Sequence, residues 1–497
     1  MSPFRLLLHF LMRSCIIFLV LLSCFSVPFQ EINAEPANLN GQLNNILKKY
    51  SLKNAHCGIN VLSLKNNSPL LQYRSDDLFM IASNMKLFTT ATALEYLGPN
   101  FTYITSVEAD GKITDNGILE GNLIIRGSGD PNLSGRFYNG NILAVPNSWL
   151  NAIKDSGINK ITGDIIADDS IFDRIYINDT WPKNQLHEWY CAPTSGLSFN
   201  DNCIDITFVP QNKVNGKVTL LLEPNTSLIT IHNECIYTSV NKQHTYSLYR
   251  KPGTNDIWVK GKFWTNAPKK KEWISVHNPS LYLATLFKEM LKKSGISVQG
   301  TVRLINKNDR EATLLKPIKL AKTTSTMEQS VYVTNKQSQN FYAEQILKTL
   351  GAHVRGNGST EDGLQVIRAF MEKLGFDAGK YQIRDGSGLS KENKLSPNMV
   401  TTVLSYMHTH KHRKVFYDSL PTSGIDGGLH RRMSSQSYKN KIHAKTGYIA
   451  GTSALSGYID TSKGDMLAFS ILINNFKSLH DAKKAQDAIC QFLVDSL

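Results

Sequence analysis

The chain has 497 residues, a length that predicts two or three domains. Hydrophobic residues make up 41% of it and charged residues 19%, so the composition is that of a globular protein and excludes general disorder. The formal net charge is +14, but the basic residues are dispersed and no zinc-finger, helix-turn-helix or RNP-type pattern occurs, so we expect no nucleic-acid partner.

The amino terminus is typical of a secretory signal. Arg5 and Arg13 supply positive charge, and 15–25 is an apolar run of eleven residues, short for a membrane span. We expect cleavage after Ala34, with 1–34 as a signal peptide and export to the periplasm or cell envelope; an uncleaved anchor is the alternative. The positive charge then favours contact with anionic wall polymers or a membrane surface, and a merely soluble basic surface is the other interpretation.

The next stretch predicts a helix, a hairpin and a second helix. Residues 39–50 follow an amphipathic helical pattern, and 56–63 and 69–73 predict two strands joined by a turn. Apolar residues from Asn84 to Leu97 recur near helical spacing, and Gly98-Pro99 ends that helix. Ser83 is therefore expected at a helix start.

From about residue 101 to 272 strand-like runs dominate, separated by turns rich in Gly, Pro and Asp. We interpret 101–272 as an inserted, mostly β part with one or two small domains. Helical patterns then return, and between the last of them three strands predict an antiparallel meander. The helices are expected at 279–294, 340–350, 360–374, 397–410 and 478–495, and the strands at 441–448, 453–460 and 466–475.

The amino-terminal hairpin and the carboxy-terminal meander together predict one antiparallel sheet flanked by helices. Residues 35–100 and 273–497 would then form a single discontinuous α/β (α+β) domain, interrupted by the insertion. Beyond residue 34, Cys57 and Cys490 lie in apolar segments and are expected to be buried thiols. One disulfide could form between two of three further cysteines, with the pairing open. These are Cys191, Cys203 and Cys235.

Three short motifs follow one another along the chain: Ser83-Asn84-Met85-Lys86, Ser338-Gln339-Asn340 and Lys445-Thr446-Gly447. They match the S-x-x-K, S-x-N and K-T-G set of penicillin-recognising acyl-transfer enzymes. Each alone is weak, because a capping serine, a solvated lysine or an edge-strand lysine would explain it. Together they supply a nucleophile, basic groups and an anchoring strand, each at the expected kind of element.

The first two motifs predict the acyl-transfer chemistry. Ser83 and Lys86 are three residues apart at a helix start, so their side chains share one face. A serine hydroxyl attacks slowly unless a base takes its proton, and Lys86 can be that base if burial and a second cation, Lys445, lower its pKa. Ser338 could relay the proton to the leaving amine, and Asn340 could hold the peptide carbonyl of the substrate.

The third motif predicts how the substrate is held. Gly447 lets a ligand approach the strand backbone closely, and an exposed strand edge can accept an extended peptide. Lys445 and Thr446 offer a cation and a hydroxyl to a terminal carboxylate. The backbone amides of Ser83 and Tyr448 are the candidates for an oxyanion hole.

Beyond these motifs the chain resembles the low-molecular-mass class C penicillin-binding proteins, the D-alanyl-D-alanine carboxypeptidase/endopeptidases. The resemblance implies a transpeptidase- or β-lactamase-like domain with two inserted domains, Ser83 as the acylated nucleophile, and the roles given above for the other motif residues. The residues that carry it are 82–87, 127–131 (GSGDP), 168–173 (DDSIFD), 200–203 (NDNC), 385–390 (DGSGLS) and 454–458 (ALSGY).

The resemblance also implies a pocket for the side chain of the stem peptide, often with an acidic residue. The matching stretch 181–185 (WPKNQ) lacks an acid, and Asp179 or Glu188 could substitute. Arg431 is a further expected substrate contact. The lack of an acid in 181–185 affects which stem-peptide side chain the pocket would prefer, and the expected acyl-transfer chemistry stays the same.

We therefore expect an exported serine DD-peptidase that removes the terminal D-alanine from peptidoglycan stem peptides. It would also cleave D-alanyl cross-links and be acylated by β-lactams. A β-lactamase and a non-catalytic penicillin- or peptidoglycan-binding protein are the alternatives. No cofactor or metal is expected, because His408, His410 and His412 alternate and do not converge on one helix face.

Overall fold

The computed structural model describes residues 39–312 and 317–497, so the predicted signal peptide 1–34 lies outside the described residues. Residues 46–497 form one compact unit, which holds the sheets and the site discussed below. The first described helix is α2 (Leu39–Lys49). No helix within the described part of the chain is long and apolar enough to cross a bilayer.

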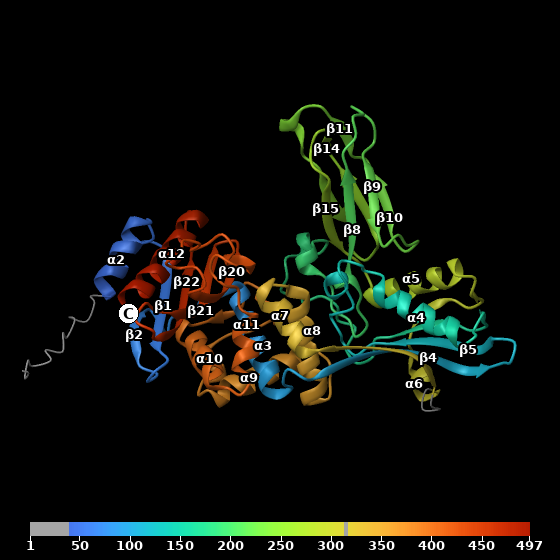
Figure 1. Cartoon of the computed structure of the whole chain (residues 1–497), viewed down its shortest axis with the longest axis horizontal. Coiled ribbons are helices and arrows are strands. Elements are labelled where there is room, and N and C mark those ends of the chain that lie inside the picture. The colour runs from blue at the N-terminus through green and yellow to red at the C-terminus, as the bar shows by residue number, and fades with distance from the viewer. Residues whose placement is uncertain (1–38, 313–316) are drawn as a thin grey trace, which may run out of the picture. The chain divides into compact units, whose positions relative to one another are not determined.

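A five-stranded antiparallel sheet joins the two ends of the unit, in the order β2-β1-β22-β21-β20 (Figure 1). The strand β22 lies between β1 and β21, so the expected sheet made from the amino-terminal hairpin and the carboxy-terminal meander is confirmed. The strands are β1 (His56–Ser63), β2 (Pro69–Tyr73), β20 (Ile442–Ile449), β21 (Thr452–Asp460) and β22 (Met466–Asn474).

Helices pack on this sheet and around a central helix, α3. The helix α10 contacts β22 and β1, α12 contacts β21, and α3 contacts α7, α8 and α10. Ten consecutive residues of α3 are buried, and its threonines Thr90 and Thr92 satisfy their hydroxyls by donating to the carbonyls of Lys86 and Phe88. The helices are α3 (Met85–Tyr96), α7 (Met327–Lys336), α8 (Asn340–Leu350), α9 (Thr360–Lys373), α10 (Pro397–Thr409), α11 (Arg413–Ser419) and α12 (Leu479–Ser496).

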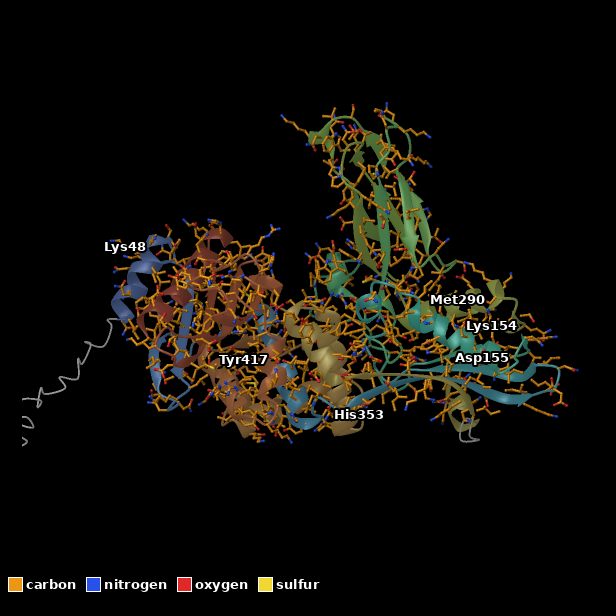
Figure 2. All side chains as sticks on the ribbon, viewed as in Figure 1. Lys48, Lys154, Asp155, Met290, His353 and Tyr417 are labelled. Carbon is orange, nitrogen blue, oxygen red and sulfur yellow. The ribbon has the colours of Figure 1, made fainter. Side chains whose placement is uncertain are left out.

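The inserted part contains a seven-stranded mixed sheet. Its main path runs β16-β6-β5-β4-β18, with β7 paired to β5 and β17 paired to β7. Two helices, α4 (Ala144–Asp155) and α5 (Pro279–Lys293), pack on it and carry the labelled residues Lys154 and Met290 of Figure 2. The strands are β4 (Thr102–Ile113), β5 (Ile118–Arg126), β6 (Lys160–Ile161), β7 (Ile165–Asp168), β16 (Ser297–Val298), β17 (Val302–Leu304) and β18 (Ile318–Thr326).

The rest of the insertion is built from small sheets, as its strand-like pattern predicted. Their orders are β15-β8-β9, β10-β13-β12 and β11-β14. The strands are β8 (Cys203–Val209), β9 (Thr219–Glu223), β10 (Thr230–Asn233), β11 (Ile236–Thr238), β12 (Ser247–Arg250), β13 (Asp256–Lys260), β14 (Lys262–Trp264) and β15 (Lys270–Ser275). The remaining α-helix of the described chain is α6 (Lys307–Ala312). Outside the insertion, the short strands β3 (Phe79–Met80) and β19 (Lys394–Leu395) pair with each other.

Two features of the insertion differ from the sequence expectation. The helix α4, which contains Pro146, was not predicted from the sequence. The structure accommodates this proline because it lies in the first turn, where a backbone N–H would have no partner within the helix. The strand β18 pairs with β4, and α5 belongs to the same core as the inserted sheet. We therefore propose that the chain returns to the helices of the five-stranded sheet near Met327, later than the predicted residue 272.

All five cysteines of the described chain are free and buried. The thiols of Cys57 and Cys490 are buried as expected, and burial raises the pKa of Cys57 to about 11. The disulfide considered among Cys191, Cys203 and Cys235 does not form in the structure.

Candidate active site

The predicted nucleophile Ser83 lines a cleft of about 880 Å³. It belongs to a 3-10 turn, η1 (Ala82–Asn84), that leads into α3, so its expected place at a helix start is found. The turn is fixed by Asn84, whose Nδ2 donates to the Lys445 carbonyl at 2.9 Å and whose Oδ1 accepts from Ser456 Oγ at 2.7 Å. The helix start is therefore tied to strands β20 and β21 directly.

Lys86 is fully buried beneath Ser83 in the first turn of α3. Its Nζ lies 3.0 Å from Ser83 Oγ, 2.7 Å from Asn340 Oδ1 and 2.6 Å from the Ser387 carbonyl oxygen. An ammonium donates to all three oxygens, whereas a neutral amine has two N–H donors and one lone pair. Since the amide and carbonyl oxygens can only accept, a neutral Lys86 would keep those two contacts and turn its lone pair to the Ser83 hydroxyl.

Burial lowers the pKa of Lys86 to about 7, against the opposing effect of the Asp385 and Glu344 carboxylates. A large share of the Lys86 side chains is then neutral at neutral pH. The sequence predicted that the charge of Lys445 would lower the pKa of Lys86. In the structure the charge of Lys86 acts on Lys445 instead: burial, and then this charge, hold the pKa of Lys445 well below its usual range.

The loop that supplies the Ser387 carbonyl is held by two buried carboxyl groups. Glu344 of α8 accepts from the backbone N–H groups of Gly386 at 3.0 Å and Ser387 at 2.8 Å. This aims the carbonyl of Ser387 at Lys86. Burial and the neighbouring Asp385 raise the pKa of Glu344 to about 8.

Asp385 stabilises the same loop by accepting hydrogen bonds from its backbone. Its Oδ1 accepts from Gly388 N–H at 2.8 Å, and its Oδ2 accepts from Ser390 N–H at 2.7 Å and from the indole N–H of Trp181 at 2.9 Å. Trp181 is buried and belongs to the inserted part. The carboxylate therefore links the loop beside Lys86 to the insertion.

The second motif stands between Lys445 and Lys86. Ser338 Oγ accepts from Lys445 Nζ at 2.7 Å, and the backbone of Ser338 has a φ of 58°, a left-handed conformation that is strained for a residue with a side chain. Asn340, the first residue of α8, accepts from Lys86 through Oδ1 and donates through Nδ2 to the Tyr190 carbonyl at 2.9 Å. Asn340 thus connects the buried lysine to a loop of the insertion.

The third motif lies on β20, which is an edge strand of the five-stranded sheet. Thr446, Gly447 and Tyr448 line the cleft, and Tyr448 is 55% exposed. A Cβ on Gly447 would lie 3.1 Å from the backbone nitrogen of Ser83, closer than ordinary van der Waals contact, so a larger residue would press against that turn. The strand therefore runs directly beside the serine.

The structure thus brings the sequence-predicted residues of all three motifs into one cleft. Ser83, Ser338, Asn340, Thr446, Gly447 and Tyr448 line it, and Lys86 and Lys445 are buried behind Ser83 and Ser338. Arg431 is not among the lining residues, whereas its neighbour Arg432 and Lys483 of α12 are.

The insertion forms the opposite side of the cleft. Pro182 and Gln185, from the stretch that lacks an acid, line it, but neither Asp179 nor Glu188 does. Among the lining residues that the structure describes, the one carboxylate is Glu392, which accepts from Arg384 Nε at 3.0 Å.

Sequence reasoning did not assign roles to Glu344, Asp385 or Asn84. The acidic residue inside the apolar helix 340–350 was a signal, because a glutamate on a buried face needs a partner. In the part of the chain that the structure describes, no group of three or more metal-ligating side chains occurs; of the three histidines near 410, His410 contacts Glu95 at 3.0 Å.

Comparisons with known proteins identify the family and its relatives. The model of the D-Ala-D-Ala carboxypeptidase 3 (S13) family matches residues 39–496. The D-alanyl-D-alanine carboxypeptidase of Actinomadura sp. (strain R39) is 28% identical over 93% of this chain and 85% of its own length. The carboxypeptidase DacB of Haemophilus influenzae is 26% identical over 85% of this chain and 86% of its own.

A likeness to solved structures concerns the fold. The crystal structure of penicillin binding protein 4 from Haemophilus influenzae superposes with a TM-score of 0.76, at 24% identity, over 90% of this chain and 97% of that one. A second structure of that protein, complexed with a β-lactam, has a TM-score of 0.72. The predicted transpeptidase-like fold with a β-rich insertion is therefore confirmed.

Proposed function

Because the chain belongs to the D-Ala-D-Ala carboxypeptidase 3 (S13) family, we propose that it cleaves peptidoglycan stem peptides through an acyl-enzyme formed at Ser83. It is a serine-type carboxypeptidase, whose substrate ends in D-Ala-D-Ala. The observation that carries the assignment of the nucleophile is the contact of 3.0 Å between Lys86 Nζ and Ser83 Oγ, made by a lysine whose pKa burial lowers to about 7.

In the acylation step neutral Lys86 takes the Ser83 proton while Oγ attacks the carbonyl carbon of the penultimate D-alanine. The negative charge that develops on the carbonyl oxygen is stabilised by the N–H groups of Ser83 and Tyr448. The C–N bond then breaks, and the proton that Lys86 took from Ser83 passes by way of Ser338 to the leaving D-alanine amine, which returns Lys86 to its neutral form. The contact of 2.7 Å between Ser338 Oγ and Lys445 Nζ supports this relay.

Substrate binding follows from the strand β20. The stem peptide would lie extended along the outer edge of this strand, with its terminal carboxylate at Thr446, in front of the buried Lys445, and a peptide carbonyl at Asn340. Water then attacks the ester carbonyl while neutral Lys86 takes its proton. The bond to Ser83 Oγ breaks and that proton passes to Oγ, which restores both Ser83 and Lys86. These steps require no metal ion or cofactor.

The same site would hydrolyse D-alanyl cross-links, because their scissile bond also follows a D-alanine carbonyl. β-Lactams would acylate Ser83, since their strained amide imitates the D-alanyl-D-alanine end. Export by the predicted signal peptide 1–34 would bring the enzyme to this substrate in the periplasm or cell envelope. A peripheral contact with the membrane or with wall polymers would follow from the net charge of +14.

The test is the intact mass of the protein over time after penicillin is added, with Ser83→Ala beside it. We expect one long-lived adduct that depends on Ser83, and release of D-alanine from a stem peptide by the wild type alone. An adduct that vanished within seconds while penicillin was consumed would instead indicate a β-lactamase. The absence of an adduct on folded protein would contradict the assignment of Ser83.

A further inference from the structure

A second cavity of about 470 Å³ adjoins the cleft, a volume in the usual range for ligand sites. Trp189 lines both hollows. The turn of the second motif also separates the two hollows. Ser338 and Asn340 line the cleft, and Gln339 between them lines the second cavity. A ligand could therefore extend from the nucleophile into this cavity.

Two half-exposed indoles face the second cavity. An isolated antiparallel bridge joins Glu188 to Ile274, and the residues next to them, Trp189 and Trp273, both belong to the wall of this cavity. Both line the cavity, and their exposed fractions are 37% and 47%. Large apolar rings left open to water inside a concave site indicate a ligand with an apolar face.

The charged groups of the cavity compensate one another. Arg136 donates to Asp201 through Nε at 3.2 Å, and Lys271 Nζ lies 2.6 Å from Asp205 Oδ2. The lining thus carries two cations and two carboxylates, each cation paired with a carboxylate. A cavity without net charge gives no advantage to a phosphate polymer or to a cationic side chain, but its fixed donors and acceptors suit a neutral ligand with many hydroxyls.

From these observations we infer that the second cavity binds the amino-sugar strand from which the stem peptide hangs. Pyranose rings have apolar C–H faces that stack on indoles and hydroxyl and acetamide groups at their edges that match the paired polar side chains. The identity of the attached peptide rests on the proposed function, whereas the sugar site rests on the cavity itself. The enzyme would then recognise a peptide and its glycan together.

The residues between the two hollows connect the proposed sugar site to the residues around Ser83. Trp189 directly precedes Tyr190, whose carbonyl accepts from Asn340 Nδ2 at 2.9 Å, and Arg136 of the cavity also donates to Gln337, which lines the cleft. A sugar seated on Trp189 therefore steadies the loop that orients Asn340. Peptides attached to their glycan should be cleaved more efficiently than free peptides.

The binding test uses the full chain and the β-1,4-linked trimer of N-acetylglucosamine, titrated by calorimetry. We expect Trp273→Ala to weaken binding about fivefold or more. The matched control is Trp258→Ala, which removes a part-buried indole that stacks on His232 and lines neither hollow. Equal binding by both variants, or tighter Trp273-dependent binding of a phosphate polymer than of the sugar trimer, would overturn the proposal.

The kinetic test compares kcat/KM for a stem peptide with and without its attached disaccharide. The wild type and Trp258→Ala should prefer the disaccharide-linked form, and Trp273→Ala should lose this preference while penicillin acylates all three at the same rate. If penicillin acylates them but no preference exists, the sugar site is wrong and the proposed function stands. If the trimer binds but Ser83 is never acylated, the proposed function fails and the sugar site stands.

Discussion

At the scale of single residues, the site depends on two buried lysines that cannot both carry a proton without cost. Lys86 and Lys445 are each fully buried, and the charge of Lys86 is a cause of the low pKa of Lys445. Their acceptors are serine, amide and carbonyl oxygens, none of them ionised. Burial without a directly paired carboxylate is what makes an amine a base at neutral pH.

The acylation rate should depend on the protonation of Lys86. Because its pKa is about 7, the neutral amine is scarce at pH 5.5, and the second-order rate of acylation by penicillin should rise with pH and level off above pH 8. Stopped-flow measurements from pH 5.5 to 8.5 would check this profile. Lys86→Arg should slow acylation roughly 10²–10⁴-fold, since a guanidinium stays protonated. A rate independent of pH in the wild type would contradict the role of Lys86.

Gly388 offers a test of how tightly the loop beside Lys86 is packed. Its φ is +81°, and a Cβ would lie 1.8 Å from the Ala82 carbonyl oxygen, so Gly388→Ala combines backbone strain with a clash against the turn that carries Ser83. We expect a loss of more than about 3 kcal/mol in stability, or rearrangement of the turn with loss of acylation.

The control for this substitution has the same backbone conformation. Gly356 also has a φ of +81°, but nothing lies within 4 Å of its Cβ position, so Gly356→Ala should cost only about 1–2 kcal/mol. Thermal unfolding of both variants would measure the difference. Equal losses would show that the turn gives way to the added methyl group.

At the scale of elements, α8 links the second motif to the loop of Ser387 through Glu344. The pKa of Glu344 is about 8 in the folded protein and 4.5 in the unfolded chain, so the folded state binds the proton more tightly. This contribution to the free energy of unfolding is therefore fully present below pH 4.5 and is lost as the pH rises to 8. Glu344→Gln keeps an oxygen for the two N–H groups and does not ionise. The fall in melting temperature between pH 5 and pH 8 should therefore be smaller in the variant.

A matched control for that experiment is Glu361→Gln at the exposed start of α9. The side chain of Glu361 is 64% exposed, so its removal should leave the pH dependence of stability unchanged. An identical fall in the wild type, Glu344→Gln and Glu361→Gln would mean that Glu344 is ionised in the folded protein throughout this range.

The elements themselves were largely predictable where one local signal sufficed. The helices α8, α9, α10 and α12 and the strands β20, β21 and β22 follow clear periodicities, and three spaced motifs located the cleft. The helix α7 was missed, although Thr326 caps it, because polar residues interrupt its apolar stripe. The contacts of Glu344 and Asp385 were not predictable, because they depend on how a distant loop packs against α3.

At the scale of the whole molecule, the site is assembled from distant parts of the chain. Ser83 follows the first strands, Ser338 follows the insertion, and Lys445 comes only with β20. The strand β22, which pairs with β1 from His56↔Asn474 to Ser63↔Leu467, lies in the middle of the sheet that holds β20 in place. Long-range pairing of this kind is slow and cooperative.

Removal of residues 465–497 should therefore abolish acylation by penicillin, although every motif residue remains. Both β1 and β21 lose a partner, and α12 no longer covers β21. Removal of 495–497 alone is the control, because the last buried residues of α12 are Leu493 and Val494. A single penicilloyl adduct on the shorter chain, measured by intact mass, would show that the site forms without β22.

The central position of β22 also has a consequence for timing. A chain that is synthesised from its amino terminus contains Ser83 long before β22, although β22 is the strand that closes the sheet between β1 and β21. We therefore expect Ser83 to lack its full surroundings until β22 has been made, so that the capacity to cut is acquired in one late step.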